Sequence, residues 1–105
     1  MEPFYTFHIE LKKLNKKLLS LSTQVEERFR QATSLITNYD EQIAQSLILS
    51  DYQIDEQEVE IEEDCLKILA LHQPVAGDLR FIITVIKVNN ELERIADMGV
   101  NIAIG

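Results

Sequence analysis

The sequence predicts an all-α fold, an antiparallel bundle of three helices. Apolar residues recur in alternating steps of four and three, and the chain has only 3 Gly and 2 Pro among its 105 residues. So few chain-breaking residues are typical of long helices rather than of turn-rich β folds. We expect helices at about residues 4–37, 40–72 and 75–104, within one domain that spans residues 1–105.

The first predicted helix carries a continuous heptad stripe. Arg28 occupies the one position of this stripe that is not apolar, and the regular pattern is a strong helix signal. Lys12, Lys13, Lys16 and Lys17 lie on other faces, where we interpret them as solvated charge. The apolar members of the stripe are Phe7, Leu11, Leu14, Leu18, Leu21, Val25, Ala32 and Leu35.

The second predicted helix has acidic residues inside its core stripe. An apolar residue recurs every seven positions from Leu47 to Ile68. The second core position of the same heptads is filled by Asp51, Glu58 and Cys65. Two acids in a stripe that should be apolar break the local rule, and such breaks often mark function. Cys65 is interpreted as a small core residue, and a single cysteine excludes an internal disulfide.

The third predicted helix is apolar on nearly every side in its first half, so we expect it to be covered all round. Isoleucines at positions 82, 83 and 86 predict an exposed surface that needs a partner. The core stripe is expected to consist of Phe81, Val85, Val88, Leu92, Ile95, Gly99 and Ile102.

Two short connections separate the predicted helices, and short connections make neighbouring helices antiparallel. Asn38 can cap the second helix, with Glu41 three residues later as in a capping box. The second helix is expected to end near His72. Pro74 suits the first turn of the third helix, where its missing N–H costs nothing.

Composition excludes several classes of function. The net charge of -8 disfavours nucleic acid and anionic membrane as direct ligands, and it favours cations and basic protein surfaces. No apolar stretch approaches the ~20 residues of a bilayer span, so we expect no membrane insertion. The sequence shows no nucleophile–base arrangement, phosphate-binding glycine loop or paired-cysteine motif, which argues against an enzyme. A metal-dependent hydrolase or oxidase lacks an identifiable base.

Glu93 and Asp97 lie four residues apart, so a helix places both carboxylates on one face. Like charges at one place repel unless a cation, a proton or a basic group lies between them. A hairpin that turns near Pro74 brings Asp55 level with Glu93 and Asp51 level with Asp97. We therefore expect four carboxylates in one patch of the second and third helices.

Two interpretations of this patch stay open on spacing alone. A divalent or trivalent metal with all-oxygen ligands (Fe, Mg, Mn or Zn) removes the repulsion, and hard cations suit such ligands. Alternatively, the acids form a solvated face paired to Arg94 and Lys87, as in a purely structural acidic helical interaction module without metal. Glu58 falls level with Asn90 on the same register.

Three stretches of the sequence resemble the PhoU family of phosphate-uptake regulators. They are ALHQPVAGDLR at 70–80, NELERIAD at 90–97 and NIA at 101–103, and DYQID at 51–55 also fits. The resemblance implies a cytoplasmic, non-enzymatic negative regulator of the phosphate-starvation response. It further implies a phosphate ABC transporter ATPase and a sensor histidine kinase as partners.

The resemblance also implies a metal site. Glu93 and Asp97 match the family's Glu/Asp-x-x-x-Asp motif, and Asp51 and Asp55 match as its partner on the neighbouring helix. The groups expected to support the metal ligands are Asn90, Asn101 and Glu58.

The family normally has two copies of the three-helix unit, and this chain has one. We therefore expect half of a two-repeat protein, as a fragment, a truncated form or a single-repeat homologue. The alternative is a self-associating unit, a homo-oligomer such as a homodimer, in which a second copy replaces the missing repeat.

Overall fold

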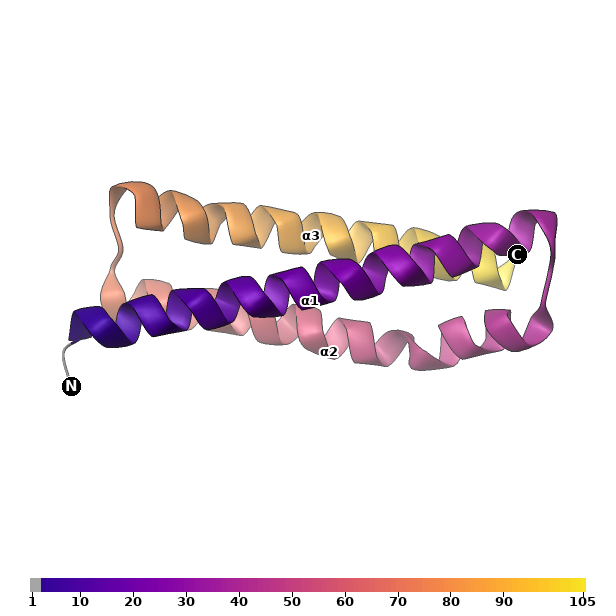
Figure 1. The fold of residues 1–105 in the computed structure, drawn as a ribbon, viewed down its shortest axis with the longest axis horizontal. Coiled ribbons are helices and arrows are strands. Elements are labelled where there is room, and N and C mark those ends of the chain that lie inside the picture. Colours follow the sequence, from indigo (N-terminus) through magenta and orange to yellow (C-terminus); the bar gives the residue numbers. More distant parts are fainter. Residues whose placement is uncertain (1–2) are drawn as a thin grey trace.

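Three long helices form an antiparallel bundle, as the sequence predicts. The computed structural model describes residues 3–105, with their side chains from Thr6 onward. The helices are α1 (Pro3–Thr37), α2 (Glu41–His72) and α3 (Ala76–Ile104), and the bundle measures 53 × 23 × 17 Å (Figure 1). The helix bounds agree with the predicted ones to within one residue. None of the three helices, over the described residues, is long and apolar enough to cross a membrane.

The caps differ from the predicted ones. Asp40, not Asn38, caps α2, because its Oδ1 accepts hydrogen bonds from the backbone N–H of Gln42 and Ile43 at 2.9 and 3.3 Å. Asn38 is still tied to α1, since its N–H donates to the Ser34 carbonyl at 2.9 Å. The capping-box prediction was therefore wrong by two residues.

Pro74 lies in the connection before α3 rather than in its first turn. Gln73 ends α2 in the left-handed region (φ 44), and its N–H donates to the Leu69 carbonyl at 3.2 Å. Val75 is extended at the start of α3 and provides no side-chain cap. The prediction was wrong because it assigned Pro74 to the first turn of the third helix, whereas the structure places this residue in the linker.

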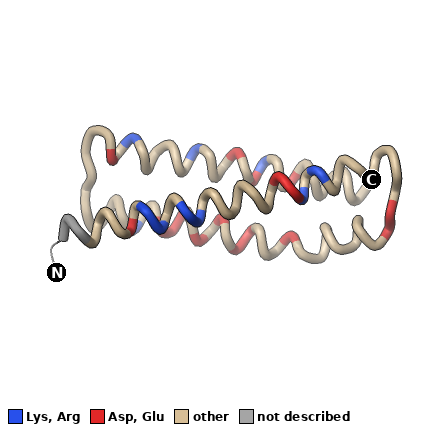
Figure 2. Tube along the Cα trace, viewed as in Figure 1, with Lys and Arg blue, Asp and Glu red and all other residues tan. Residues whose placement is uncertain are grey.

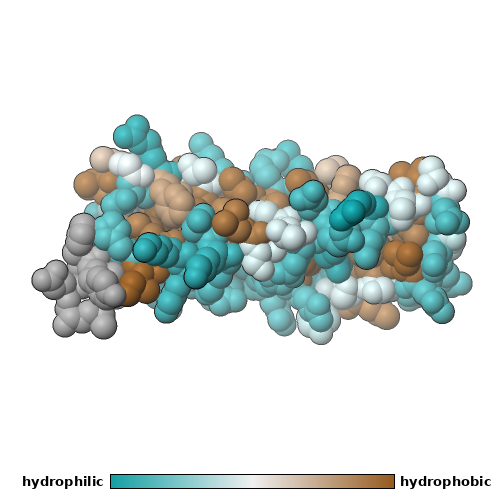
Figure 3. Space-filling model, in the orientation of Figure 1, coloured by the Kyte–Doolittle hydropathy of each residue, from teal (hydrophilic) through white to brown (hydrophobic). Residues whose placement is uncertain are grey.

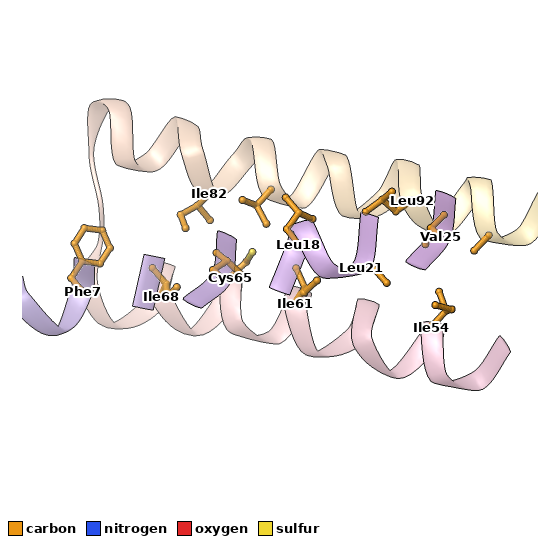
Figure 4. Packing of buried hydrophobic residues seen from close by; sticks show 13 residues of the cluster. Phe7, Leu18, Leu21, Val25, Ile54, Ile61, Cys65, Ile68, Ile82 and Leu92 are labelled. Carbon is orange, nitrogen blue, oxygen red and sulfur yellow. The ribbon is translucent and has the colours of Figure 1, made fainter. Parts of the chain in front are cut away.

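The main core runs along the bundle axis and contains residues of all three helices (Figure 4). The predicted stripe of α1 is confirmed, with Leu14, Leu21 and Val25 almost completely buried. Cys65 is fully buried in α2, where burial raises the pKa of its thiol to about 11, as suits a core residue rather than a nucleophile. A smaller cluster closes the other end with Ala32, Leu35, Ala44, Leu47 and Ala103.

The core stripe of α3 is rotated relative to the prediction. Val85, Leu92 and Gly99 are buried as expected, but the alternate positions were predicted one residue too early. At each of these places the prediction chose the larger apolar residue, whereas the structure buries the smaller or polar residue that follows it. Gly99 is buried against α1, where a Cβ built on it would lie at ordinary contact distance, 3.7 Å, from the Ala32 Cβ. The four buried residues that the prediction missed are Ile82, Asn89, Ala96 and Ala103.

The apolar surface is also redistributed. Of the three isoleucines predicted to form an exposed surface, Ile82 is buried, Ile86 is half-buried and only Ile83 is exposed. Exposed Tyr52, Val59 and Leu66 instead recur every seven residues along α2. On the face seen in Figure 3, hydrophobic surface forms separate patches among hydrophilic ones.

Candidate functional site

The candidate site lies where α2 and α3 pack at mid-length. Asn89 of α3 anchors the register, because its Nδ2 donates to the backbone oxygen of Glu58 at 3.0 Å. The sequence placed Glu58 level with Asn90, so the expected register is correct to within one residue. Figure 2 shows acidic positions in red on both helices in the central part of the bundle.

The carboxylates of α2 and α3 act on one another electrostatically. Glu58 is only 5% exposed, and this burial is the main cause that raises its pKa to about 7. The negative charges of Glu93, Asp55, Asp97 and Asp51 raise it further, in that order. The four predicted ligands therefore lie near enough for their charges to act on Glu58, which is the buried member of the five.

Asp51 is the partly buried member of the predicted ligand set. Burial is the main cause that raises the pKa of its carboxyl, and the charges of Asp55 and Asp97 add to the effect. The Arg28 guanidinium opposes them from α1, with its Nη2 3.9 Å from Asp51 Oδ1. This distance is too long for a direct hydrogen bond.

Arg28 is committed elsewhere. Its guanidinium donates to Ser50 Oγ and to the Leu47 carbonyl, both at 2.7 Å. The Arg28 side chain is 19% exposed, so it lies largely inside the stripe that the sequence assigned to the core. Its positive charge acts on Asp51 from α1.

Three buried oxygen atoms at this level accept no hydrogen bond from the described residues: Asp51 Oδ1, Glu58 Oε1 and Asn89 Oδ1. A buried acceptor without a partner costs about 1–3 kcal/mol. Asp51 and Glu58 thus present electron pairs that a proton, a water or a cation can use.

The remaining predicted residues lie at the surface. Asp55, Glu93 and Asp97 are exposed, and no hydrogen bond or ion pair to the described residues holds their carboxylates. Asn90 and Asn101 are exposed on α3, and their role in supporting a metal stays a prediction.

The side chains do not converge on one point as they stand. Over the described part of the chain, no three His, Cys, Asp or Glu side chains are grouped closely enough to hold a metal ion. The oxygen donors suit a hard cation in chemical type, and their helices bring them to one level. To ligate an ion, the exposed side chains Asp55, Glu93 and Asp97 have to turn toward Asp51.

Sequence reasoning missed Asn89 and Arg28. Asn89 was overlooked because Val88 beside it fits an apolar stripe better, although a polar residue in the middle of an apolar run is itself a signal. Arg28 was recognised as the gap in the α1 heptads but was not connected with Asp51. A cation in one stripe and an acid in the next were the available clue to their proximity.

Comparison with known proteins gives a consistent family. The PhoU domain family model matches residues 18–104. The chain is 37% identical over 93 residues to the phosphate-specific transport system accessory protein PhoU of Serratia marcescens, covering 89% of this chain and 38% of that protein. It is 36% identical over 94 residues to the homologue of Aquifex aeolicus, with 90% and 42% covered. No solved structure matches the chain.

A third relative, the PhoU homologue of Pseudomonas putida, is 38% identical over 97 residues, which cover 92% of this chain and 38% of the relative. The chain thus spans about two-fifths of the length of these curated relatives. The family match and the all-helical fold agree with the resemblance seen in the sequence. The chain belongs to the PhoU family.

Proposed function

We propose that this chain is a regulatory domain that serves a phosphate-specific transport system and carries a metal on the carboxylate cluster of α2 and α3. Family membership supports the first part, because the relatives are named accessory proteins of such systems. The domain acts by binding rather than by catalysis. Its partners are the ATPase of a phosphate ABC transporter and a sensor histidine kinase, and it restrains the phosphate-starvation response in the cytoplasm.

The metal proposal depends on one observation: five carboxylates of α2 and α3 lie near enough to act on one another electrostatically. They are Asp51, Asp55, Glu58, Glu93 and Asp97. Asp51 and Glu58 have buried oxygens without a hydrogen-bond donor, and burial first, then the charges of their acidic neighbours, raises the pKa of both carboxyls. A cation bound by Asp51, Asp55, Glu93 and Asp97 relieves this repulsion. When bound, the metal offers inorganic phosphate a positive site, by which the domain can report phosphate.

The alternative is an acidic helical interaction module without metal. The unconverged side chains favour it, as does Arg28, which already opposes the charge of Asp51. The two proposals differ in one measurable respect, because only the first gives a stability that depends on a metal ion.

Metal content separates the two. The protein is purified without chelator and compared with Glu93→Ala/Asp97→Ala and with the control Glu56→Ala/Glu63→Ala, which removes two exposed α2 acids that do not act on Glu58. We expect elemental analysis to find metal in the wild type and the control and to find it lost from the first variant. Equal metal in all three contradicts the site, and metal in none of them supports the module without metal.

We also propose self-association through the exposed apolar row of α2. Tyr52, Val59 and Leu66 lie 57%, 53% and 54% exposed at heptad spacing, the arrangement of a helix face that packs on another helix. A second copy of the chain is the proposed occupant. Sedimentation at micromolar concentration is expected to show a dimer that Val59→Glu/Leu66→Glu converts to a monomer. A wild type that sediments only as a monomer contradicts the proposal.

A further inference from the structure

Four of the ten Lys and Arg residues of this acidic chain line two neighbouring hollows between α1 and α2. The chain has 10 Lys and Arg residues; four are lysines of α1, and a fifth, Lys67, belongs to α2. Figure 2 shows the lysines of α1 in blue in the N-terminal half of that helix. Lys67 joins them because it lines the same hollow as Lys13 and Lys17. Lys12 is directed elsewhere, because it lines a hollow with Asp78 and Phe81 of α3.

Among the described side chains, Lys17 is the lysine of this group with a carboxylate partner. Lys17 Nζ lies 2.7 Å from Glu60 Oε1 and 2.7 Å from Asp64 Oδ2, and these hydrogen bonds raise its pKa. Across the side chains that the structure describes, the lysines of this group without an ion pair are Lys12, Lys13, Lys16 and Lys67. Solvated charge, the interpretation that the sequence favours for the α1 lysines, does not describe Lys17, because this residue is ion-paired.

Two hollows follow one another between α1 and α2, on either side of Lys17. We call them together the lysine groove. The first has a volume of about 200 Å³ and is lined by Lys13, Lys17, Lys67, Glu10, Asp64 and Ile68. The second has a volume of about 250 Å³ and is lined by Lys16, Lys17, Ser20, Gln57, Glu60 and Ile61.

The carboxylates that line the first hollow are already engaged. Glu10 Oε2 lies 3.0 Å from His72 Nε2, and Asp64 is paired with Lys17. Lys13 and Lys67 therefore line one hollow from two helices, and no described carboxylate forms an ion pair with either of them. Like charges that share a site repel, and an anion placed between them removes the cost.

We propose that the lysine groove binds an acidic segment of a partner protein. The Asp or Glu side chains of the segment would enter the two hollows and meet Lys13, Lys67 and Lys16. The apolar floor of each hollow, Ile68 in one and Ile61 in the other, would contact the stems of these side chains. This surface involves α1 and is separate from the carboxylate cluster of α2 and α3.

The shape of the groove favours a segment over a single small anion. The lining residues of α1 run from Glu10 to Ser20, about 15 Å of helix at 1.5 Å per residue. Two hollows in sequence match several acidic side chains of one chain, whereas an inorganic anion occupies only one of them. Charge complementarity then sets the register of the segment and speeds its association.

The surroundings of the groove argue against an anionic membrane. Exposed Glu56, Glu60 and Glu63 follow the outer side of α2 next to the groove. A flat anionic bilayer pressed against Lys13 and Lys16 would also approach these acids, and the repulsion offsets the attraction. A narrow segment can reach Lys13, Lys16 and Lys67 while staying away from exposed Glu56 and Glu63.

Binding of a labelled peptide of alternating Glu and Ala, measured by fluorescence anisotropy at low salt with EDTA present, tests the proposal. The variant is Lys13→Glu/Lys67→Glu, and the control Arg80→Glu/Lys87→Glu reverses two exposed, unpaired charges of α3. We expect the affinity to fall about tenfold or more in the variant and less than about twofold in the control, and binding to weaken as salt screens the charges. Circular dichroism checks the fold, and Lys13→Gln/Lys67→Gln is expected to give an intermediate loss.

Four outcomes of the peptide experiment overturn the proposal. They are no binding of the peptide at low salt, equal losses in variant and control, equal binding of a peptide with Gln in place of Glu, and displacement of the peptide by equimolar inorganic phosphate. Binding of phosphatidylserine vesicles in place of the peptide, lost in the same variant, overturns it in favour of a membrane. Because EDTA removes metal throughout, failure here leaves the metal proposal standing.

Discussion

The carboxylate cluster and the lysine groove are both gatherings of like charge, yet their surroundings differ. The cluster contains a buried acid, Glu58, whose pKa is raised to about 7, and Asp51 beside it is also displaced toward protonation. The lysines of the groove lie at the surface, and the one that is drawn between the helices, Lys17, has two carboxylate partners at 2.7 Å.

The comparison teaches that burial, more than the number of charges, decides where charge costs stability. Water and salt screen exposed lysines, so their repulsion is small. The buried oxygens of Asp51 and Glu58 have neither solvent nor a donor. The cluster therefore stores an unfavourable free energy that a ligand can release, and the groove offers mainly orientation and attraction.

The largest expected effect is on Glu58. Its folded-state pKa of about 7 lies above its ordinary value of 4.5. Between these two pH values, the folded protein therefore binds more protons than the unfolded chain. Stability is then full below about pH 4.5 and falls as pH rises toward 7, by at most about 3 kcal/mol. Glu58→Gln removes this loss, because glutamine carries no charge.

Urea unfolding at pH 4 and pH 8 in EDTA measures this effect. We expect Glu58→Gln to equal the wild type within about 1 kcal/mol at pH 4 and to be about 2–3 kcal/mol more stable at pH 8. The exposed Glu56→Gln serves as the control and is expected to change stability little at either pH. A Glu58→Gln protein that is less stable than the wild type at pH 8 contradicts the assignment of a buried, strained charge.

A smaller effect is expected at Arg28. Arg28→Met removes the positive charge that opposes Asp51 and two hydrogen bonds of 2.7 Å, to Ser50 and to the Leu47 carbonyl. We expect a loss of about 1–3 kcal/mol at pH 8 in thermal unfolding, because partners are left unsatisfied in a largely buried place. Arg28→Met/Asp51→Asn is expected to recover part of the loss, and no recovery would separate Arg28 from the cluster.

The smallest effect is expected at Lys17. Lys17→Met breaks two ion pairs of a lysine whose side chain is 39% exposed, so we expect a loss below about 1 kcal/mol, which disappears in high salt. Thermal unfolding at low and high salt measures it. A loss of stability equal to that of Arg28→Met would contradict the distinction between the buried carboxylate cluster and the exposed lysine groove.

The sequence was sufficient to predict the three-helix architecture and which acidic residues of α2 and α3 lie side by side along the bundle. Heptad steps and the scarcity of Gly and Pro determine three helices, and a hairpin at Pro74 leaves little choice of register, so the level of Asp55 and Glu93 was predictable. The rotation of α3 was not. That helix offers apolar residues on adjacent faces, and the structure buries the face that carries Gly99 and Ala96.

The details of the site depend on tertiary contacts that spacing cannot reveal. Asn89 enters the core because it can donate to the Glu58 carbonyl, and Arg28 stays in an apolar stripe because Ser50 and Leu47 accept its hydrogen bonds. Whether exposed Glu93 and Asp97 converge on an ion is decided by side-chain rotation, which a ligand can drive.

Paramagnetic Mn²⁺ added in small amounts to the isotope-labelled chain is the most direct test of the proposed metal site, since it broadens the amide resonances nearest to the bound ion. We expect the resonances around Asp51, Asp55, Glu93 and Asp97 to broaden first, while those of the α1 lysines remain sharp, and Glu93→Ala/Asp97→Ala to abolish the effect. Broadening that is uniform over the acidic surface, or that begins at exposed Glu56 and Glu63, contradicts a specific site between α2 and α3.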